Sequence, residues 1–215
     1  MFRILLILGL AIFANANNLT LQNGEIKAHT EVFGDSEINP TTKNVKGDLT
    51  IEDTIESIKG QIYFETLSLV SDKKGRDEHM YELLKVEKFK TISFDIKSIT
   101  KNQNGYDING IVTLNGVSKN ITTKAMIYRQ NNQLLLNGEF SFNLTDFSLE
   151  PPTMMFLTVR NQIDIFYNIT LEWVLCNNLS YDIALITGIG TWGIDFRYKA
   201  NAEITIIKLI AKSVE

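Results

Sequence analysis

The sequence predicts an all-β fold: an antiparallel eight-stranded barrel with one short capping helix. Apolar and polar residues alternate through most of residues 24–172, which is typical of antiparallel strands with one buried face. The segments between these runs are short and rich in Asn and Gly, as in hairpins. Residues 75–89 break the alternation and space their apolar side chains closer to a helical repeat.

Eight strands are expected along the chain, each with apolar residues at every second position. The opposite positions are mostly Lys, Asp, Glu, Asn, Gln, Ser and Thr, as on a surface that faces water. The apolar positions, strand by strand, are Ile26, Ala28, Val32; Val45, Leu49, Ile51; Ile58, Ile62, Phe64; Ile92, Phe94, Ile96; Tyr106, Ile108, Val112, Leu114; Ile121, Ala125, Ile127; Leu134, Leu136, Phe140, Phe142, Leu144; and Ile163, Ile165, Tyr167, Ile169, Leu171.

The connections between the later strands predict tight turns. Residues 102–105 (NQNG), 114–118 (LNGVS) and 129–133 (RQNNQ) contain Asn or Gly, which tolerate left-handed backbone angles. Eight long strands with one apolar face can pack as a two-sheet sandwich or close into a barrel. Simple sequential order and tight turns favour an up-and-down barrel, in which closure removes the unpaired edges.

Four glycines, Gly47, Gly60, Gly110 and Gly138, fall on the inward positions of these strands. A glycine inside a strand marks a bend or a close approach to the backbone. The four glycines indicate a barrel with interior room, since a missing side chain on the inner wall leaves space for a ligand. The alternative is that they only relieve curvature around a filled core.

The break in the strand pattern predicts a helix over residues 78–86. Asp77 stands where an N-cap residue is expected, and Glu78 would lie in the positively polarised first turn. Met80, Leu83 and Leu84 would then face one end of the barrel. The helix is therefore expected to act as a lid or plug.

Three stretches resemble the YceI-like family. Residues 76–96 (RDEHMYELLKVEKFKTISFDI) resemble the family's Arg-Asp-x-His segment, together with the helix, Phe-containing turn and strand that follow it. Residues 110–121 (GIVTLNGVSKNI) resemble a later stretch of the family, with Ser118 in place of the usual threonine. Residues 142–172 look like the last two strands and their loop. The first strand, NGEIKAHTEVFG, departs from the family pattern because it lacks the usual tryptophan and has only His29 in a comparable place.

The resemblance implies an exported, lipocalin-like barrel that holds a polyisoprenoid or another amphiphilic lipid inside, with no further cofactor. Arg76, Asp77 and His79 have two alternatives: a structural cap that fixes the lid, which we favour, or, for Arg76 and His79, contact with a ligand head group at the mouth. The loop 146–159 is either a ligand gate or a segment tucked over the barrel end. The expected ligand contacts are Ile62, Phe64, Arg76, Asp77, His79, Met80, Phe94, Ile96, Ile108, Val112, Phe140, Phe142, Met154, Phe156 and Ile165.

Charge and residue types exclude several function classes. The net charge is −4, and no run of Lys and Arg exceeds two residues, so nucleic acid is not an expected partner. The two histidines, His29 and His79, have no metal-ligand spacing. No nucleophile paired with a base and no Gly-rich phosphate loop occurs, so neither catalysis nor a metal site is expected.

The two ends of the chain are expected to differ from the barrel, which we assign to residues 17–172. Arg3, the apolar stretch 4–13 and the small residues 14–16 predict a signal peptide over 1–16 and a periplasmic location. No later stretch is long enough to anchor the mature chain in a membrane.

The single cysteine, Cys176, allows no intramolecular disulfide but could cross-link a homodimer. Residues 173–215 lie beyond the resemblance. An alternative function is therefore a filled barrel whose C-terminal extension docks a partner.

Overall fold

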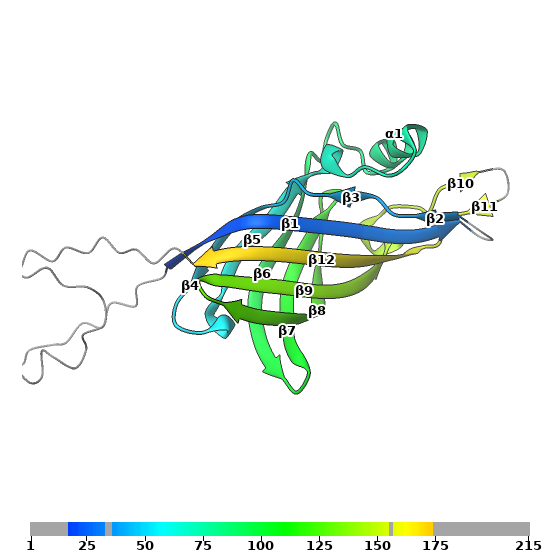
Figure 1. The fold of residues 1–215 in the computed structure, drawn as a ribbon. Helices are drawn as coiled ribbons and strands as arrows, with labels where there is room; N and C mark the ends of the chain where they lie inside the picture. Colours follow the sequence, from blue (N-terminus) through cyan, green and yellow to red (C-terminus); the bar gives the residue numbers. More distant parts are fainter. Residues whose placement is uncertain (1–16, 33–35, 155–156, 174–215) are drawn as a thin grey trace, which may run out of the picture. The chain divides into compact units, whose positions relative to one another are not determined.

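The computed structural model describes residues 17–32, 36–154 and 157–173. Eight strands form the closed barrel of Figure 1, and consecutive strands pair antiparallel until the last returns to the first. The predicted fold class is therefore confirmed. The barrel strands are β1 (Asn17–Val32), β4 (Lys46–Ile51), β5 (Lys59–Glu65), β6 (Thr91–Asn102), β7 (Gly105–Leu114), β8 (Val117–Gln130), β9 (Gln133–Asn143) and β12 (Gln162–Trp173).

Two short strands, β2 (Ser36–Ile38) and β3 (Thr41–Thr42), run along β1 in line with β4. They complete the barrel wall where β4 ends, and Thr41 exchanges two backbone hydrogen bonds with Val70. The remaining elements of the described chain are short: η1 (Ile55–Ser57), η2 (Thr66–Ser68), η3 (Leu144–Phe147), β10 (Thr153–Met154) and β11 (Leu157–Thr158).

The turns between the later strands agree with the hairpins expected from Asn and Gly. Asn115 and Gly116 both have positive φ angles, 51° and 71°, between β7 and β8. Asn131 (φ 56°) turns the chain between β8 and β9, and Gly105 (φ 141°) follows the turn between β6 and β7. Asparagine and glycine are the residues that adopt such angles most readily.

The helix α1 spans Lys74–Leu83 and so begins four residues earlier than the predicted 78–86. The prediction that Asp77 is the N-cap is wrong, since Lys73 occupies that position and Asp77 lies in the first turn. The buried Asp77 carboxylate instead accepts the backbone N–H of Ser71, at 2.8 Å, and so holds the turn that precedes the helix. The helix ends before Lys85, whose φ is 51°.

The inward side chains form two packed clusters. The closed-end cluster consists of Leu19, Val45, Leu49, Ile51, Ile58, Ile62, Ile96, Ile99, Ile108, Ala125, Ile127, Leu134, Leu136, Tyr167, Ile169 and Leu171. The lid-end cluster consists of Phe64, Leu69, Leu84, Val86, Val112, Leu114, Leu144, Phe147, Leu149 and Ile163. Ile26, Phe94 and Phe140 are only partly buried and pack against both clusters, so the least filled part of the interior lies between them.

The inward glycines do not supply the interior room that the sequence suggested. A Cβ at Gly110 would collide with the Phe94 ring, and one at Gly138 would collide with the Tyr167 phenol. A Cβ at Gly60, where φ is 119°, would strike the backbone of β4. The strand glycines therefore make room for aromatic rings and for close strand contact rather than for a ligand.

Candidate functional site

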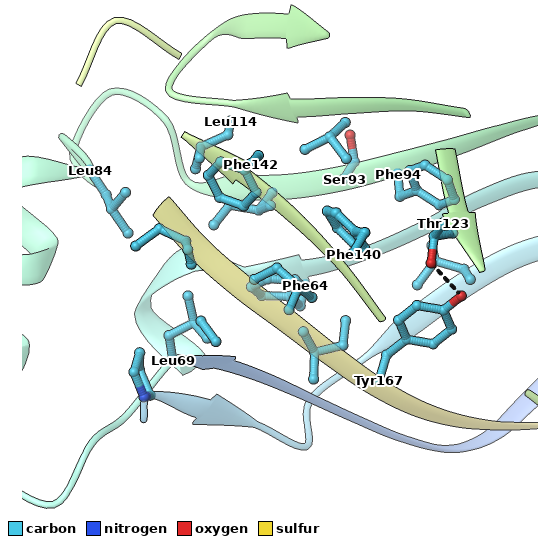
Figure 2. Close-up of a pocket in the computed structure, with 18 of the residues that line it drawn as sticks. Phe64, Leu69, Leu84, Ser93, Phe94, Leu114, Thr123, Phe140, Phe142 and Tyr167 are labelled. Atoms are coloured by element: carbon cyan, nitrogen blue, oxygen red, sulfur yellow. Dashed lines mark hydrogen bonds between the residues drawn. The ribbon is translucent and has the colours of Figure 1, made fainter. Parts of the chain in front are cut away.

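A cavity of about 190 Å³ lies inside the barrel between the closed-end cluster and the lid. Figure 2 shows Leu69 and Leu84 toward one end of this cavity and Thr123 and Tyr167 toward the other. The lining residues are Ile26, Ala28, Pro40, Ile62, Phe64, Leu69, Met80, Leu83, Leu84, Ile92, Ser93, Phe94, Ile96, Ile108, Val112, Leu114, Thr123, Leu136, Phe140, Phe142, Leu144, Ile163, Ile165, Tyr167 and Ile169.

The wall of the cavity is almost entirely apolar. None of the described residues that line it is charged, and only Ser93, Thr123 and Tyr167 have hydroxyl groups. The Tyr167 and Thr123 hydroxyls lie 3.0 Å apart, and the Thr123 hydroxyl also donates to the Glu139 carbonyl oxygen at 2.9 Å. Burial raises the pKa of Tyr167 to about 12, so the phenol stays protonated at physiological pH.

Aromatic side chains form one side of the cavity. The ring centroids of Phe94 and Phe140 are 6.5 Å apart, and those of Phe140 and Phe142 are 6.3 Å apart. Phe142 meets the edge of Phe147, which is fully buried, at 5.0 Å. Phe94, Phe140 and Phe142 remain partly accessible although they point inward, because the space in front of them is empty.

The helix α1 and the turn after it close the cavity on one side. Met80, Leu83 and Leu84 line it, as expected for a lid. The Tyr81 hydroxyl donates to the carbonyl oxygens of Leu69, at 2.6 Å, and Leu67, at 3.1 Å. Since Leu69 also lines the cavity, these bonds tie the helix directly to the cavity wall.

Ten of the fifteen expected contact residues lie on the cavity wall: Ile62, Phe64, Met80, Phe94, Ile96, Ile108, Val112, Phe140, Phe142 and Ile165. Whether they touch a ligand stays a prediction.

Arg76, Asp77 and His79 are not on the wall. Arg76 pairs with Asp72 at 2.8 Å, Asp77 holds the turn at Ser71, and His79 is exposed on α1. Their placement agrees with the structural alternative. The helix begins earlier than predicted, and these polar side chains do not line the cavity.

The first part of the segment 146–159 covers the lid end of the barrel. Phe147 and Leu149 are buried in the lid-end cluster. Met154 falls in β10, but its side chain and all of Phe156 lie outside the described residues. The same is true of the predicted signal peptide 1–16, of residues 174–215 and of Cys176.

Fifteen further wall residues were not among the expected contacts. Eleven of them were expected to face the barrel interior or its mouth; Pro40, Leu69, Ser93 and Thr123 were not. Thr123 lies on the inward positions of β8 between Ile121 and Ala125, so its place in the alternation was the available signal. Pro40 and Leu69 lie outside the strands, where no periodicity indicates which side chains face inward.

Two further properties of the described residues concern metal binding and membrane spanning. No group of three or more His, Cys, Asp or Glu side chains is arranged to hold a metal ion there. Nor does that part of the chain contain a helix long and apolar enough to cross a membrane.

Comparison with known proteins identifies the family. The profile of the YceI-like domain matches residues 19–171, which is nearly the whole barrel. The chain belongs to the YceI-like family. Among curated relatives, a UPF0312 protein of Serratia proteamaculans (strain 568) is 32% identical over 114 residues, 52% of this chain and 59% of the relative. The UPF0312 protein YE1254 of Yersinia enterocolitica is 34% identical over 73 residues, 33% and 38% of the two chains. The chain thus spans less than two thirds of the length of these relatives.

Solved structures with low sequence identity share the fold. BcnA of Burkholderia cenocepacia superposes with a TM-score of 0.60 at 11% identity, covering 68% of this chain and 95% of BcnA. A polyisoprenoid binding domain from Saccharophagus degradans gives a TM-score of 0.58 at 11% identity, with coverage of 73% and 99%. The YceI protein of Campylobacter jejuni gives 0.55 at 18% identity, with coverage of 64% and 86%. At these identities the likeness shows the YceI-like fold.

Proposed function

We propose that this YceI-like protein binds a polyisoprenoid or a similar amphiphilic lipid inside its barrel and performs no catalysis. The observation that carries the proposal is the cavity itself, enclosed by the barrel and the lid and lined without a charged side chain. Such a wall suits a hydrocarbon chain and gives a polar substrate no charged partner. The polyisoprenoid binding domain of Saccharophagus degradans, which shares the fold, supports this class of ligand.

The free energy gained by moving a hydrocarbon tail from water into the cavity is large enough to hold such a ligand. Burying hydrocarbon stabilises by about 0.8 kcal/mol per methylene. A tail of about a dozen carbons therefore contributes about 10 kcal/mol, which offsets an association cost in the lower half of the range of roughly 4–15 kcal/mol without a charged contact. The polar head of the lipid would remain near the lid, where water can solvate it.

The alternative of a filled barrel is supported only at the closed end. There Ile58, Leu134 and Leu171 are fully buried in one cluster, and none of them lines the cavity. Between this cluster and the lid the interior is hollow. A binding role uses the hollow part, and the filled part supplies packing energy.

Export is a second part of the proposal. The positive charge, apolar stretch and small residues of 1–16 support cleavage after Ala16 and release into the periplasm. The mass of the intact chain recovered from a periplasmic fraction tests this, since a cleaved chain begins at Asn17. Recovery of the full-length chain from the cytoplasm alone would overturn it.

Native mass spectrometry tests the ligand. The protein is purified without detergent and measured beside an organic-solvent extract of the same preparation. Ile165→Trp should fill the cavity and abolish the bound mass, because Ile165 lies on its wall. Phe166→Trp is the matched control, since the neighbouring Phe166 is 40% exposed on the outer face.

A stoichiometric lipid mass on the wild type and on Phe166→Trp, and not on Ile165→Trp, is the expected result. A protein that is empty and takes up no added prenyl or fatty compound would refute the proposal. Equal lipid on both variants would place the ligand outside the cavity.

A further inference from the structure

The cavity ends toward the closed-end cluster on a floor of inward side chains from neighbouring strands. Tyr167 is the largest of them, and Ile96, Ile108, Thr123 and Leu136 lie around it. Figure 2 shows the Tyr167 ring directed to Thr123, with Phe94 beside this pair and Phe140 between the pair and the lid end. The floor therefore belongs both to the cavity wall and to the packed cluster below it.

The position of Tyr167 follows from strand register. Tyr167 on β12 pairs with Gly138 on β9, and Gly138 pairs with Ala125 on β8. Because Gly138 has no side chain, the phenol lies across β9 and reaches Thr123 on β8, where the two hydroxyls are 3.0 Å apart. The hydrogen bond and the glycine together fix the ring across the interior.

Beneath this ring the cavity continues by only one further inward position on β12, where Ile169 and its partner Leu136 still line it. Ile127 and Leu134 are buried in the closed-end cluster, Leu134 with 1% of its surface exposed, and neither lines the cavity. A chain that enters from the lid end therefore meets Tyr167 close to the end of the cavity.

The floor also favours a hydrocarbon end over a polar head. The Thr123 hydroxyl donates to the Glu139 carbonyl oxygen, so the Tyr167 hydroxyl is the donor in the bond between them. Both hydroxyl hydrogens are thus engaged, and a head group that accepts hydrogen bonds would be buried there without a donor. Burying an unsatisfied polar group costs about 1–3 kcal/mol, so the tail enters first.

We propose that Tyr167, held across the barrel by Gly138 and Thr123, limits the length of hydrocarbon tail that the cavity accepts. This inference rests on the proposed lipid-binding function. A tail shorter than the distance from lid to floor leaves space unfilled, and any part of a longer tail remains in water. Affinity should rise with chain length and then stop rising at the length that reaches Tyr167.

A homologous series of prenyl alcohols, each one isoprene unit longer than the last, measures this limit. Displacement of a fluorescent fatty acid from the full chain gives the dissociation constant for each alcohol. Every unit that fits inside should tighten binding by at least about tenfold, and units beyond the limit should change it by less than about threefold.

Tyr167→Ala should move the limit to a longer alcohol, because it opens space at the floor. Leu134→Ala is the matched control: it also removes a large buried side chain, but below the floor and away from the cavity wall. Tyr167→Leu, which keeps an apolar side chain, is the second variant if Tyr167→Ala does not fold. Circular dichroism verifies the folding of each variant.

The outcomes separate the two proposals. A limit that shifts in a Tyr167 variant and stays in Leu134→Ala supports the role of Tyr167. If the wild type binds the series and the Tyr167 variants show the same length limit as the wild type, the role of Tyr167 is overturned and the lipid-binding proposal stands. A wild type that binds no alcohol of the series overturns both.

Discussion

The bond between Tyr81 and the cavity wall gives a direct test of the lid. Tyr81→Phe removes the hydroxyl that donates to the carbonyl oxygens of Leu69 and Leu67, at 2.6 and 3.1 Å. A neutral hydrogen bond contributes about 0.5–1.5 kcal/mol net. Both carbonyl groups can bind water once the lid opens, so the substitution destabilises the closed state and not the open state. The open population should therefore rise roughly two- to tenfold, at about 1.4 kcal/mol per factor of ten.

Two measurements detect this change. Hydrogen exchange of the amides in residues 71–88 reports lid opening, and stopped-flow release of a fluorescent fatty acid reports ligand exit. Both should accelerate by the same factor in Tyr81→Phe. Tyr128→Phe is the control, because Tyr128 is 54% exposed in β8, and it should leave both rates unchanged.

The two measurements can also give results that contradict the prediction in different ways. Faster exchange in residues 71–88 with unchanged release would show that the ligand does not leave past α1. Unchanged rates in both measurements would show that the Tyr81 hydroxyl does not hold the lid.

Three stability predictions follow from buried and charged groups. Phe147→Ala should lower the free energy of unfolding by about 3–5 kcal/mol in urea denaturation, because the ring is fully buried at the lid end; Phe166→Ala on the outer face should cost far less. Burial raises the pKa of Tyr167 from 10 to about 12, so the unfolded chain releases a proton from pH 10 upward that the folded chain keeps. The free energy of unfolding of the wild type should therefore fall between pH 10 and 12 by up to about 3 kcal/mol more than that of Tyr167→Phe. An equal fall in the two proteins would contradict this. Burial alone would raise the pKa of Asp164, but hydrogen bonds from Ser141, Gln162 and Arg160 and the charge of Arg160 lower it below 3.8. This stabilisation is present above pH 3.8 and is lost as the pH falls through the lowered pKa. Acid should therefore destabilise the wild type more than Asp164→Asn. Parallel acid denaturation curves of the two proteins would refute this.

The barrel could be predicted because strand alternation fixes which side chains face inward. Ile62, Phe94, Val112 and Ile165 lie on the cavity wall for this reason alone. Alternation does not show which inward positions enclose empty space. Val45 and Leu134 follow the same pattern and yet pack in the filled end.

The misassigned residues depend on contacts that the residue pattern around them does not show. Asp77 looked like an N-cap because of the residues beside it, whereas its carboxylate accepts the Ser71 amide and the helix begins at Lys74. Gly110 and Gly138 looked like space for a ligand, whereas Phe94 and Tyr167 from other strands cover them. Strand register decides such contacts, and a single strand's sequence does not reveal it.

The division of the barrel into a filled and a hollow part has an energetic consequence. An empty cavity of 190 Å³ costs on the order of 5 kcal/mol relative to a packed interior, at about 24 cal/mol per Å³. The closed-end cluster offsets this cost, and a ligand that fills the cavity removes part of it and adds stability by mass action. Solvent-extracted protein should therefore unfold at a lower temperature than protein reloaded with lipid, and in Ile165→Trp extraction should change the unfolding temperature much less. Equal unfolding temperatures of extracted and reloaded wild type would show that no lipid stabilises the barrel.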